Sequence, residues 1–559
     1  MADASGAPAQ PGEAASDPQT HRRFALSRAG LILLALLVIA FLLRLRTIAF
    51  GLPALNDPDE LMFELGAVRM LGNGTMNPGW FGHPATTTIY VLALADILVF
   101  AGGYVTGHIA SPAHFAELVY GDPTWVILPG RIAMALFAIG TLVLLYRLAR
   151  RLFGPAAALV AVALLVVSPL HITLSQLIRS DMMASVFMLL TMFAAIGYAE
   201  KGDRRSLILA ALWVGLAMAT KWPFGMSALA FAGAVALRWR DGKIGVASAI
   251  GALAVMAALT LVFFLLTTPY IILDHQTVAK NLSGESQIKH LGATGGAPWE
   301  NGWFYLRVAL VNALGLPTLA LALYGAWRAR SERLFWWIVA PVGITFFLVL
   351  TLQTLMWERW ALPLLFPIAM LAGLGFVDIL RRIARRPVAG AAGAAMLALM
   401  LVPSVLGLMS DDRERATDTR QIAADWARRN IPAGQDIMLE HFAFDMLPDP
   451  WGLYFPVGEV GCIDTRALLQ GRVRYDVIDD MRNGRSNVDY GTMAPHQRGT
   501  CDPDYAILTQ YERYRAERAD FPVEYAAYRE LLAKGRVVAT VTPVKGRVGG
   551  PAITIVRFR

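Results

Sequence analysis

The stretch that decides the fold runs from Trp125 to Leu174 and reads WVILPGRIAMALFAIGTLVLLYRLARRLFGPAAALVAVALLVVSPLHITL. It contains two apolar runs, each close to the roughly twenty residues that a helix needs to cross a bilayer, separated by the basic segment Arg147–Arg151. Similar runs recur from Arg28 to about Ser410, and 56% of the 559 residues are apolar whereas 16% are charged. The sequence therefore predicts a polytopic α-helical membrane protein.

Basic residues gather in the short loops between these runs, and this pattern sets the orientation of the chain. Short loops rich in Lys and Arg stay in the cytoplasm. Besides the first cluster, such loops lie at 201–205, 238–243, 328–333 and 381–386. The same clusters account for the net charge of +8, so the charge indicates membrane topology and not a nucleic-acid partner.

We expect about eleven transmembrane helices, with the C-terminus on the non-cytoplasmic side. Residues 1–27 are poor in apolar side chains and are expected to form a disordered cytoplasmic tail. The predicted crossings are 31–50, 125–149, 155–174, 182–199, 206–222, 224–238, 244–272, 303–327, 334–354, 361–380 and 388–409. The first of them is expected to be an uncleaved anchor, because no small-residue cleavage site follows it.

Thr86–Tyr104 is apolar enough to cross the membrane, but a crossing there would place the Arg147–Arg151 cluster outside. Asp96 in the middle of the segment and the absence of flanking Lys or Arg favour a helix that lies along the outer membrane face. A re-entrant segment or a pair of helices would also keep the Arg147–Arg151 cluster on the cytoplasmic side.

The segment 411–559 differs from the rest because it is a mixed-charge stretch long enough for one soluble domain, which belongs outside. A helix is expected at 417–429, and strand-like runs lie at 437–439, 505–508, 537–541 and 553–556. This pattern predicts a small extracytoplasmic α/β domain. The two cysteines of the chain, Cys462 and Cys501, both lie here; an oxidising compartment favours a disulfide between them, and two free buried thiols are the alternative.

All large polar segments face the non-cytoplasmic side in this topology, and the cytoplasmic loops are too short for a nucleotide-binding domain. The outward segments are the loop 51–124, the turn at Ser180–Asp181, the loop 274–302 and the C-terminal domain. Soluble activated nucleotides are scarce on that side of a membrane. A synthetic enzyme there needs a donor delivered within the membrane, and a polyprenyl-phosphate carrier is the obvious candidate.

Three carboxylates, Asp57, Asp59 and Glu60, open the first outer loop. A proton acceptor needs an ionisable group partly shielded from water, and neighbouring carboxylates raise one another's pKa. The commoner use of such residues is to cap a helix N-terminus, here that of a helix beginning near Leu61. From the residues alone both roles remain open.

Charged residues also stand at three other outward positions. Arg179 and Asp181 lie at a turn between two crossings, Lys221 at the outer end of its helix, and Arg359 between two tryptophans. Each position has a plain structural explanation, because turns are polar and long cationic side chains extend to lipid headgroups beside aromatic belts. The functional alternative is that Lys221 holds a donor phosphate.

Arg131 is different because it lies inside the predicted 125–149 crossing. A charge at that depth costs about 2–3 kcal/mol and needs a partner, for which the carboxylates of the first loop are candidates. The loop 274–302 adds His275 and His290, but their spacing matches no strong zinc pattern. We expect neither a metal nor another cofactor, and a divalent cation is the alternative that the sequence leaves open.

Taken in order, six pieces of the chain resemble the GT-C membrane glycosyltransferases of family 39, the kind that includes protein O-mannosyltransferases and lipid A aminoarabinose transferases. The pieces cover about residues 28–410 and are the Asp59–Glu60 pair, GHPATTTIY, the Arg131 helix ending YRLARRLFG, SPLHITLSQLIRSD, GLAMATK and ERWALPLLFP. The resemblance implies a GT-C-like fold. It also implies an inverting transfer of a sugar from a polyprenyl-phosphate donor to a lipid, glycan or protein acceptor.

The resemblance further implies how the transfer is catalysed. Asp59 and Glu60 would be the catalytic pair, with Asp59 as the base that deprotonates the acceptor hydroxyl or amine as it attacks the anomeric carbon. Lys221 and Arg359 would stabilise the leaving lipid phosphate, as fixed cations do for developing negative charge.

Other residues would position the substrates or the catalytic loop. Asp181 matches the second acidic position of the family, and Arg131 would hold the loop through an ion pair. His83 departs from the family's His/Lys-Pro-Pro pattern because Ala85 replaces the second proline. The remaining candidates for positioning substrates are Arg179 and His290.

Two other classes of protein fit a chain of this kind. A transporter or lipid flippase would also be polytopic and basic on the inside, but such proteins place ionisable or unwound sites near the membrane midplane, often in repeated halves. A polysaccharide polymerase or ligase of another membrane fold would keep the lipid donor and lose the Asp59 assignment. We favour the glycosyltransferase, multi-pass in the cell inner membrane, with its active site on the periplasmic or extracellular side.

Overall fold

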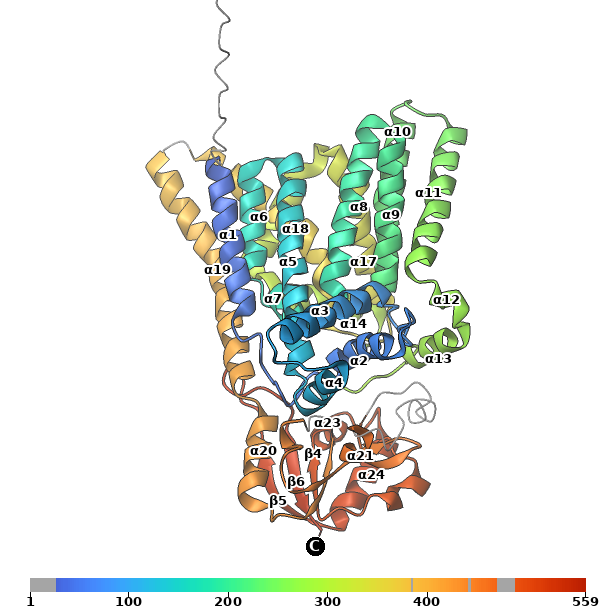
Figure 1. Cartoon of the computed structure of the whole chain (residues 1–559). Helices are drawn as coiled ribbons and strands as arrows, with labels where there is room; N and C mark the ends of the chain where they lie inside the picture. Colours follow the sequence, from blue (N-terminus) through green and yellow to red (C-terminus); the bar gives the residue numbers. More distant parts are fainter. Residues whose placement is uncertain (1–26, 384–385, 441–443, 470–487, 559) are drawn as a thin grey trace, which may run out of the picture.

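Upright helices form one part of the molecule, and a small sheet domain lies beyond one end of them (Figure 1). The computed structural model describes residues 27–383, 386–440, 444–469 and 488–558. The expected tail lies outside the described residues except for Ser27, whose hydroxyl accepts a hydrogen bond from the Gly30 N–H and caps the first helix. We call the end of the bundle that faces the sheet domain the domain end.

Eight of the described helices are long and apolar enough to cross a membrane, or up to ten if each of two bent pairs is one span. The eight include α1 (Arg28–Leu45), α3 (Thr86–Val105), α5 (Thr124–Phe153), α8 (Asp181–Lys201), α11 (Val246–Thr267) and α19 (Arg386–Ala416). The other two contain α17 (Ala340–Leu352) and α18 (Leu362–Arg382). The expectation of about eleven excludes α3 and counts each bent pair as one span. It also includes two shorter helices that stand upright beside α8, namely α9 (Arg204–Thr220) and α10 (Ala228–Arg240) (Figure 1).

Shorter helices complete the bent spans, connect the upright helices or lie at the domain end. They are α2 (Pro58–Asn73), α4 (Pro112–Gly121), α6 (Pro155–Val166), α7 (Pro169–Ser175), α12 (Tyr270–Leu273), α13 (His275–Glu285), α14 (Pro298–Phe304), α15 (Leu310–Leu314) and α16 (Leu316–Arg328).

Two of the expected crossings are bent. Helices α6 and α7 meet at 65°, and the segment 298–314 meets the segment 316–331 at 107°. Pro169 and Pro317 lie in the first turn after each break, and a proline ring cannot continue the hydrogen bonds of a preceding helix. The first bend directs the chain into the turn that carries Arg179 and Asp181.

Helix α3 lies across the upright helices at the domain end, close to α2 and α4 (Figure 1). By length and composition alone it could span a membrane. Its orientation agrees with the expected helix along the membrane surface. The buried Asp96 faces inward, whereas Leu94, Ile97 and Leu98 are exposed, as on a helix that presents one side to lipid.

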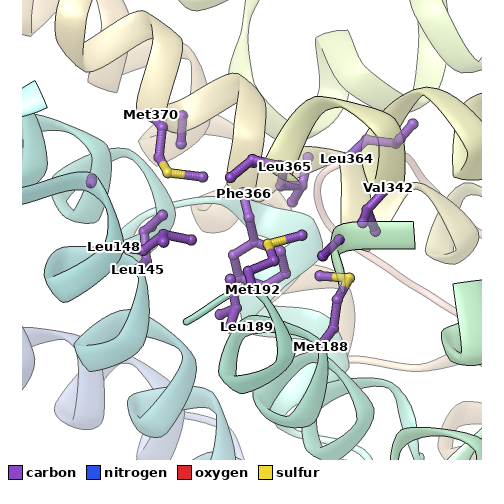
Figure 2. Packing of buried hydrophobic residues seen from close by; sticks show 14 of the residues in the cluster. Leu145, Leu148, Met188, Leu189, Met192, Val342, Leu364, Leu365, Phe366 and Met370 are labelled. Atoms are coloured by element: carbon purple, nitrogen blue, oxygen red, sulfur yellow. The ribbon is translucent and has the colours of Figure 1, made fainter. Parts of the chain in front are cut away.

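The centre of the bundle is an apolar core in which side chains from different helices interlock. Figure 2 shows the core residues Leu145, Leu148, Met188, Leu189, Met192, Val342, Leu364, Leu365, Phe366 and Met370. Small residues allow close helix contacts around α18: a Cβ added at Gly373 would collide with the carbonyl oxygen of Ala157, and one at Gly325 with that of Leu371. This packing fixes the helix ends that carry the charged residues discussed below.

The C-terminal domain contains a six-stranded mixed sheet of order β3-β2-β1-β4-β6-β5. Its strands are β1 (Asp436–Leu439), β2 (Gly452–Val457), β3 (Gly461–Asp464), β4 (Tyr505–Leu508), β5 (Arg536–Val541) and β6 (Ile553–Arg557). β1 pairs in parallel with β2 and β4, and the other pairs are antiparallel. The expected helix is α20 (Thr419–Asn430), and all four expected strands are present. Strands β2 and β3 were not expected, and Cys462 of β3 forms a disulfide with Cys501.

Helices cover both faces of this sheet because alternate strand residues point to opposite sides. Ile437 and Leu439 pack with α20, whereas Met438 packs on the face covered by α23 (Tyr511–Ala516) and α24 (Pro522–Ala533). Leu291, from the loop that follows α13, is buried among the apolar residues on the same face as Met438. Its carbonyl accepts a hydrogen bond from Arg513 Nη2 at 2.9 Å, so the sheet domain is attached to that loop.

Candidate functional site

The start of α2 gives its neighbouring carboxylates different surroundings. Asp57 is the N-cap: its Oδ1 accepts a hydrogen bond from the Asp59 N–H at 3.0 Å, and Pro58 occupies the first helical position. The side chain of Asp59 instead points toward two arginines. The capping role therefore falls to Asp57, which leaves Asp59 available for an ionic site.

Arg179 and Arg359 both approach the carboxylate of Asp59. Arg179 Nη1 lies 2.7 Å from Asp59 Oδ2, and its Nη2 lies 3.0 Å from Asp57 Oδ2. Arg359 Nη1 lies 3.8 Å from Asp59 Oδ2, and its guanidinium covers the Trp357 ring at 4.1 Å from the centroid. The Asp59 side chain is still 45% exposed, so one side of the carboxylate is open.

A second ion pair joins Lys221 and Asp181, with Nζ and Oδ1 2.7 Å apart. Asp181 begins α8, and Lys221 follows α9 in an extended conformation that forms a bridge with Pro84. The Trp222 N–H donates to the His83 carbonyl at 2.6 Å. These contacts attach the expected His-Pro segment to the end of α9.

His83 lies beside this pair as a neutral ring. Burial, together with the nearby Lys221 cation, lowers the pKa of His83 to about 3. Its ring packs against Trp80 and Phe63 at centroid distances of 5.1 and 5.8 Å. The buried Nδ1 has no hydrogen-bond partner among the described residues, which leaves it free for a ligand.

Glu60 and Arg131 form a separate pair that is fully buried. Arg131 Nε and Nη2 donate to the two carboxylate oxygens at 2.8 and 2.6 Å, and the Ile178 N–H donates at 3.0 Å. Arg131 Nη1 also donates to the carbonyls of Ile48 and Phe50 at 2.6 and 2.9 Å. The expected interaction of Arg131 with a carboxylate of the first loop is thus with Glu60.

Two cavities meet at this cluster. The smaller, of about 610 Å³, is lined by Asp59, His83, Asp181, Lys221 and Arg359, and by apolar residues of the bundle that include Phe346, Leu350 and Trp360. The larger, of about 1340 Å³, is lined by α7, α15 and α19 residues and by the β5–β6 turn of the sheet domain. Trp357 and Arg359 line both, and Arg179 lines the larger one. Asp59 lines the smaller cavity, and the adjacent Arg359 and Trp357 connect that cavity with the larger one.

The electrostatics of Asp59 differ from the sequence expectation. Burial by itself would raise the pKa of this carboxyl, but Arg179 and Arg359 lower it below its usual value. Adjacent carboxylates were expected to raise it. The difference arises because two arginines lie close to the Asp59 carboxylate, at 2.7 and 3.8 Å.

The loop after α13 brings His290 to the same place. Its ring contacts the Trp357 ring at 5.0 Å in an edge-on arrangement, and its Nδ1 lies 3.0 Å from the Leu291 carbonyl. All of the proposed positioning residues except Arg131 thus line one of the two cavities. Among the described residues, no group of three or more His, Cys, Asp or Glu side chains could hold a metal ion.

Three cavity residues carried no weight in the sequence analysis. Trp80 and Glu285 line the smaller cavity, and Trp357 lines both. A tryptophan beside Arg359 indicates an aromatic belt as readily as a site. Glu285 is one of several charged residues in the predicted loop 274–302, and its position there does not distinguish it from the others. It is about 200 residues from Trp80, so no local pattern connects the two.

Comparisons with known proteins agree with this fold. The family model described as dolichyl-phosphate-mannose-protein mannosyltransferase matches residues 113–272, which is less than half of the chain. ArnT from Cupriavidus metallidurans in the apo state is 15% identical with a TM-score of 0.52, and the match covers 95% of this chain and 97% of ArnT. ArnT bound to undecaprenyl phosphate matches over the same shares at 15% identity with a TM-score of 0.50.

A weaker match is an Archaeoglobus fulgidus oligosaccharyltransferase tethered with an acceptor peptide. It is 11% identical with a TM-score of 0.49, and the match covers 89% of this chain and 72% of that protein. No curated protein sequence matches the chain. The expected resemblance to GT-C glycosyltransferases of family 39 is confirmed by the family model and by the fold shared with ArnT.

Proposed function

We propose that this protein is a membrane glycosyltransferase that moves a sugar from a polyprenyl-phosphate donor to a second substrate, with Asp59 as the base. One observation carries the proposal: a partly open carboxylate lies in a cavity with apolar walls and two cations, and this cavity meets a larger one that the sheet domain helps to line. The matching family model and the fold shared with ArnT support the same class of reaction.

The smaller cavity suits the donor. Phe346, Leu350 and Trp360 provide apolar walls for the first isoprene units, and Lys221 and Arg359 provide positive charge for a phosphate. The neutral His83 adds an unpaired ring nitrogen in the same space. The ArnT of the same fold binds undecaprenyl phosphate, which favours a lipid phosphate as the ligand here.

The larger cavity suits the acceptor, whether a lipid, a glycan or a protein. Its walls include the β5–β6 turn at 543–550, so the sheet domain contributes directly to the space. Both Arg415 and Glu414 line it together with Lys545, which gives a mixed-charge surface suited to a polar headgroup or chain. We therefore assign acceptor choice to this cavity.

The chemical step follows from this placement. Asp59 takes the proton of the acceptor hydroxyl or amine while that oxygen or nitrogen bonds to the anomeric carbon. The bond between the anomeric carbon and the phosphate oxygen breaks on the opposite face, and its electron pair stays on the lipid phosphate. Attack opposite to the leaving group inverts the anomeric centre, and Lys221 and Arg359 stabilise the phosphate as charge develops.

The low pKa of Asp59 makes the resting carboxylate a weak base. A donor phosphate in the smaller cavity competes for Arg359, one of the two cations that lower this pKa. Donor binding therefore raises the proton affinity of Asp59 at the moment when a base is needed. Asp181 holds Lys221 at 2.7 Å and so acts as a positioning residue for the phosphate cation.

The orientation that fits this function places the domain end on the non-cytoplasmic side of the cell inner membrane. Helices α5, α8, α10 and α18 all have basic residues in their last turns. By the positive-inside rule these ends belong in the cytoplasm. A membrane-delivered donor then meets its acceptor outside, where nucleotide sugars are absent.

The test is sugar transfer or donor hydrolysis by the detergent-purified full chain over a panel of labelled polyprenyl-phosphate pentoses, hexoses and amino sugars. Asp59→Asn is measured beside the wild type, with Glu117→Gln of α4 as a matched control because Glu117 lies in neither cavity. Turnover by the wild type and the control, abolished in Asp59→Asn, is the expected result. Undiminished turnover in Asp59→Asn would overturn the assignment of the base. Lipid translocation without transfer, measured after reconstitution of the same preparation into vesicles, would indicate a flippase.

A further inference from the structure

Two residues that the proposed chemical step does not use meet on one wall of the smaller cavity. Trp80 precedes the His83 segment, and Glu285 ends α13. A Cβ added at Gly82 would lie 2.6 Å from the Trp80 ring and 2.9 Å from Glu285 Oε1. The indole edge and the carboxylate therefore converge over this glycine, where an L side chain would displace them.

A backbone contact explains why Glu285 faces this wall. Asn281 Oδ1 accepts a hydrogen bond from the Phe81 N–H at 2.8 Å, which fixes α13 against the 80–83 segment. Glu285 lies four residues after Asn281 and so on the same side of the helix. A second contact, from Asn77 Nδ2 to Asp274 Oδ2 at 2.9 Å, holds the start of α13 to the same loop.

The Glu285 carboxyl has no hydrogen-bond or ion-pair partner within the part of the chain that the structure describes. Burial and the charge of Asp59 raise its pKa, as expected for an acid that faces the same space as Asp59. The cluster of Asp57, Asp59 and Asp181 is already balanced by Arg179, Lys221 and Arg359. Glu285 therefore has unused acceptor capacity that a ligand can satisfy.

The Trp80 ring is held in one orientation beside this acid. It packs edge-on against Phe63 at 5.4 Å and against His83 at 5.1 Å. An aromatic surface next to a carboxylate matches the chemistry of a sugar ring, whose C–H face packs on an indole and whose hydroxyl or amino groups donate to a carboxylate. The same carboxylate repels a phosphate, and the cations that attract one lie elsewhere in the cavity, on Lys221 and Arg359.

We propose that Trp80 and Glu285 form the subsite that holds the sugar of the donor and selects among sugars by their hydrogen-bond donors. This inference rests on the proposed function, because it assumes that the ligand of the smaller cavity is a polyprenyl-phosphate sugar. The sugar then lies between this subsite and the phosphate site, with its anomeric carbon toward Asp59. Glu285 is a specificity residue, and it takes no proton in the transfer.

The test uses the full chain in detergent with Glu285→Gln, Glu285→Asp and Trp80→Phe, and with Glu117→Gln as the control. We expect Glu285→Gln to lower kcat/KM by about tenfold to a hundredfold, because charge-assisted hydrogen bonds are lost, and to change the ranking of pentose, hexose and amino-sugar donors. Glu285→Asp should restore part of the loss. Affinity for sugar-free polyprenyl phosphate should stay within about twofold of the wild type.

Binding separates a failure of this subsite from a failure of the proposed function. If the wild type transfers no sugar yet binds a polyprenyl-phosphate sugar more tightly than polyprenyl phosphate, and Glu285→Gln removes that preference, the subsite stands while the enzymatic assignment falls. An equal loss of affinity for both lipids in Glu285→Gln, or an unchanged donor ranking, overturns the subsite. Trp80→Phe keeps an aromatic ring against Phe63 and should alter donor KM more than kcat.

Discussion

Two adjacent residues of α2, Asp59 and Glu60, illustrate how differently one helix can use two carboxylates. Glu60 is fully buried and accepts three hydrogen bonds, two from Arg131 and one from the Ile178 N–H. Asp59 keeps 45% of its side chain exposed and faces two arginines at 2.7 and 3.8 Å. The hydrogen-bond capacity of Glu60 is used by structural contacts. Asp59 has an exposed side, and a phosphate can compete with it for its arginine partners.

The difference follows from helix geometry. Consecutive residues point about 100° apart around an α-helix, so Glu60 is directed into the bundle and Asp59 toward the cavity. A catalytic role for Glu60 was expected from its place in the pair. The contacts favour a positioning role, in which Glu60 and Arg131 fix the start of α2 and thereby the direction of Asp59.

The largest effect is expected from Asp59→Asn, which removes the proposed base and preserves side-chain volume. We predict a fall in kcat/KM of about a thousandfold to ten-thousandfold, the upper range for loss of general base catalysis. The midpoint of thermal unfolding should change little, because the carboxylate is partly exposed. Measurement of both quantities on one preparation checks the claim, and retention of a tenth of the activity would contradict it.

Glu60→Gln should mainly lower the stability of the protein, whereas Asp59→Asn mainly lowers its activity. We predict a loss of about 3 kcal/mol or more in the free energy of unfolding, because Arg131 is left buried without a counter-charge. Thermal or denaturant unfolding in detergent measures it. The double variant Glu60→Gln/Arg131→Met should recover part of the loss, since an apolar replacement removes the unpaired charge. Additive losses in the double variant would show that the pair is not coupled.

Arg359→Gln should lower kcat about a hundredfold, the usual scale for removing one preorganised charge at a developing anion. Stability should be nearly unaffected, because the contact of Arg359 with Asp59 is long at 3.8 Å. Single-turnover kinetics with saturating donor would measure the effect. A change confined to KM would mean that Arg359 binds the phosphate in the ground state without stabilising the transition state.

The smallest change in kcat/KM at neutral pH is expected from Arg179→Gln. Its effect should instead be seen in the pH dependence of kcat/KM. Arg179 is one of the cations that lower the pKa of Asp59, so its removal raises that pKa. The base works only when ionised. The acid limb of the kcat/KM profile should therefore lie at higher pH in the variant than in the wild type, in which the pKa of Asp59 is below its usual value. Asp57→Asn, which removes a neighbouring negative charge, should not move the limb upward.

Much of the architecture could be predicted from apolar runs and basic loops, because these depend on composition alone. The four expected strands and the helix of the C-terminal domain are present for the same reason, since alternation and helical spacing are local signals. Strands β2 and β3 were missed because Gly452, Pro456 and Gly461 interrupt their patterns. The bends at α7 and α16 were missed because each apolar run continues through its proline.

The site was only partly predictable. Charged residues stand out in an otherwise apolar chain, so Asp59, Asp181, Lys221 and Arg359 could be selected as candidates from position. Their roles came from the family resemblance and stay predictions. Which carboxylate meets which cation depends on contacts between residues about 40 to 300 positions apart, such as Lys221 with Asp181 and Arg359 with Asp59. No local pattern reports such pairing, and the same holds for Glu285 beside Trp80.

The burial of Leu291 in the sheet domain has a consequence for how such proteins can be recombined. The next residue upstream, His290, packs on Trp357 at the meeting point of both cavities, and Gly292 donates its N–H to Glu517 at 3.0 Å. A sheet domain taken from a relative would lack a core that is complementary to this leucine. Exchange of the sheet domain between relatives therefore requires that residues 286–296 be transferred together with residues 411–559.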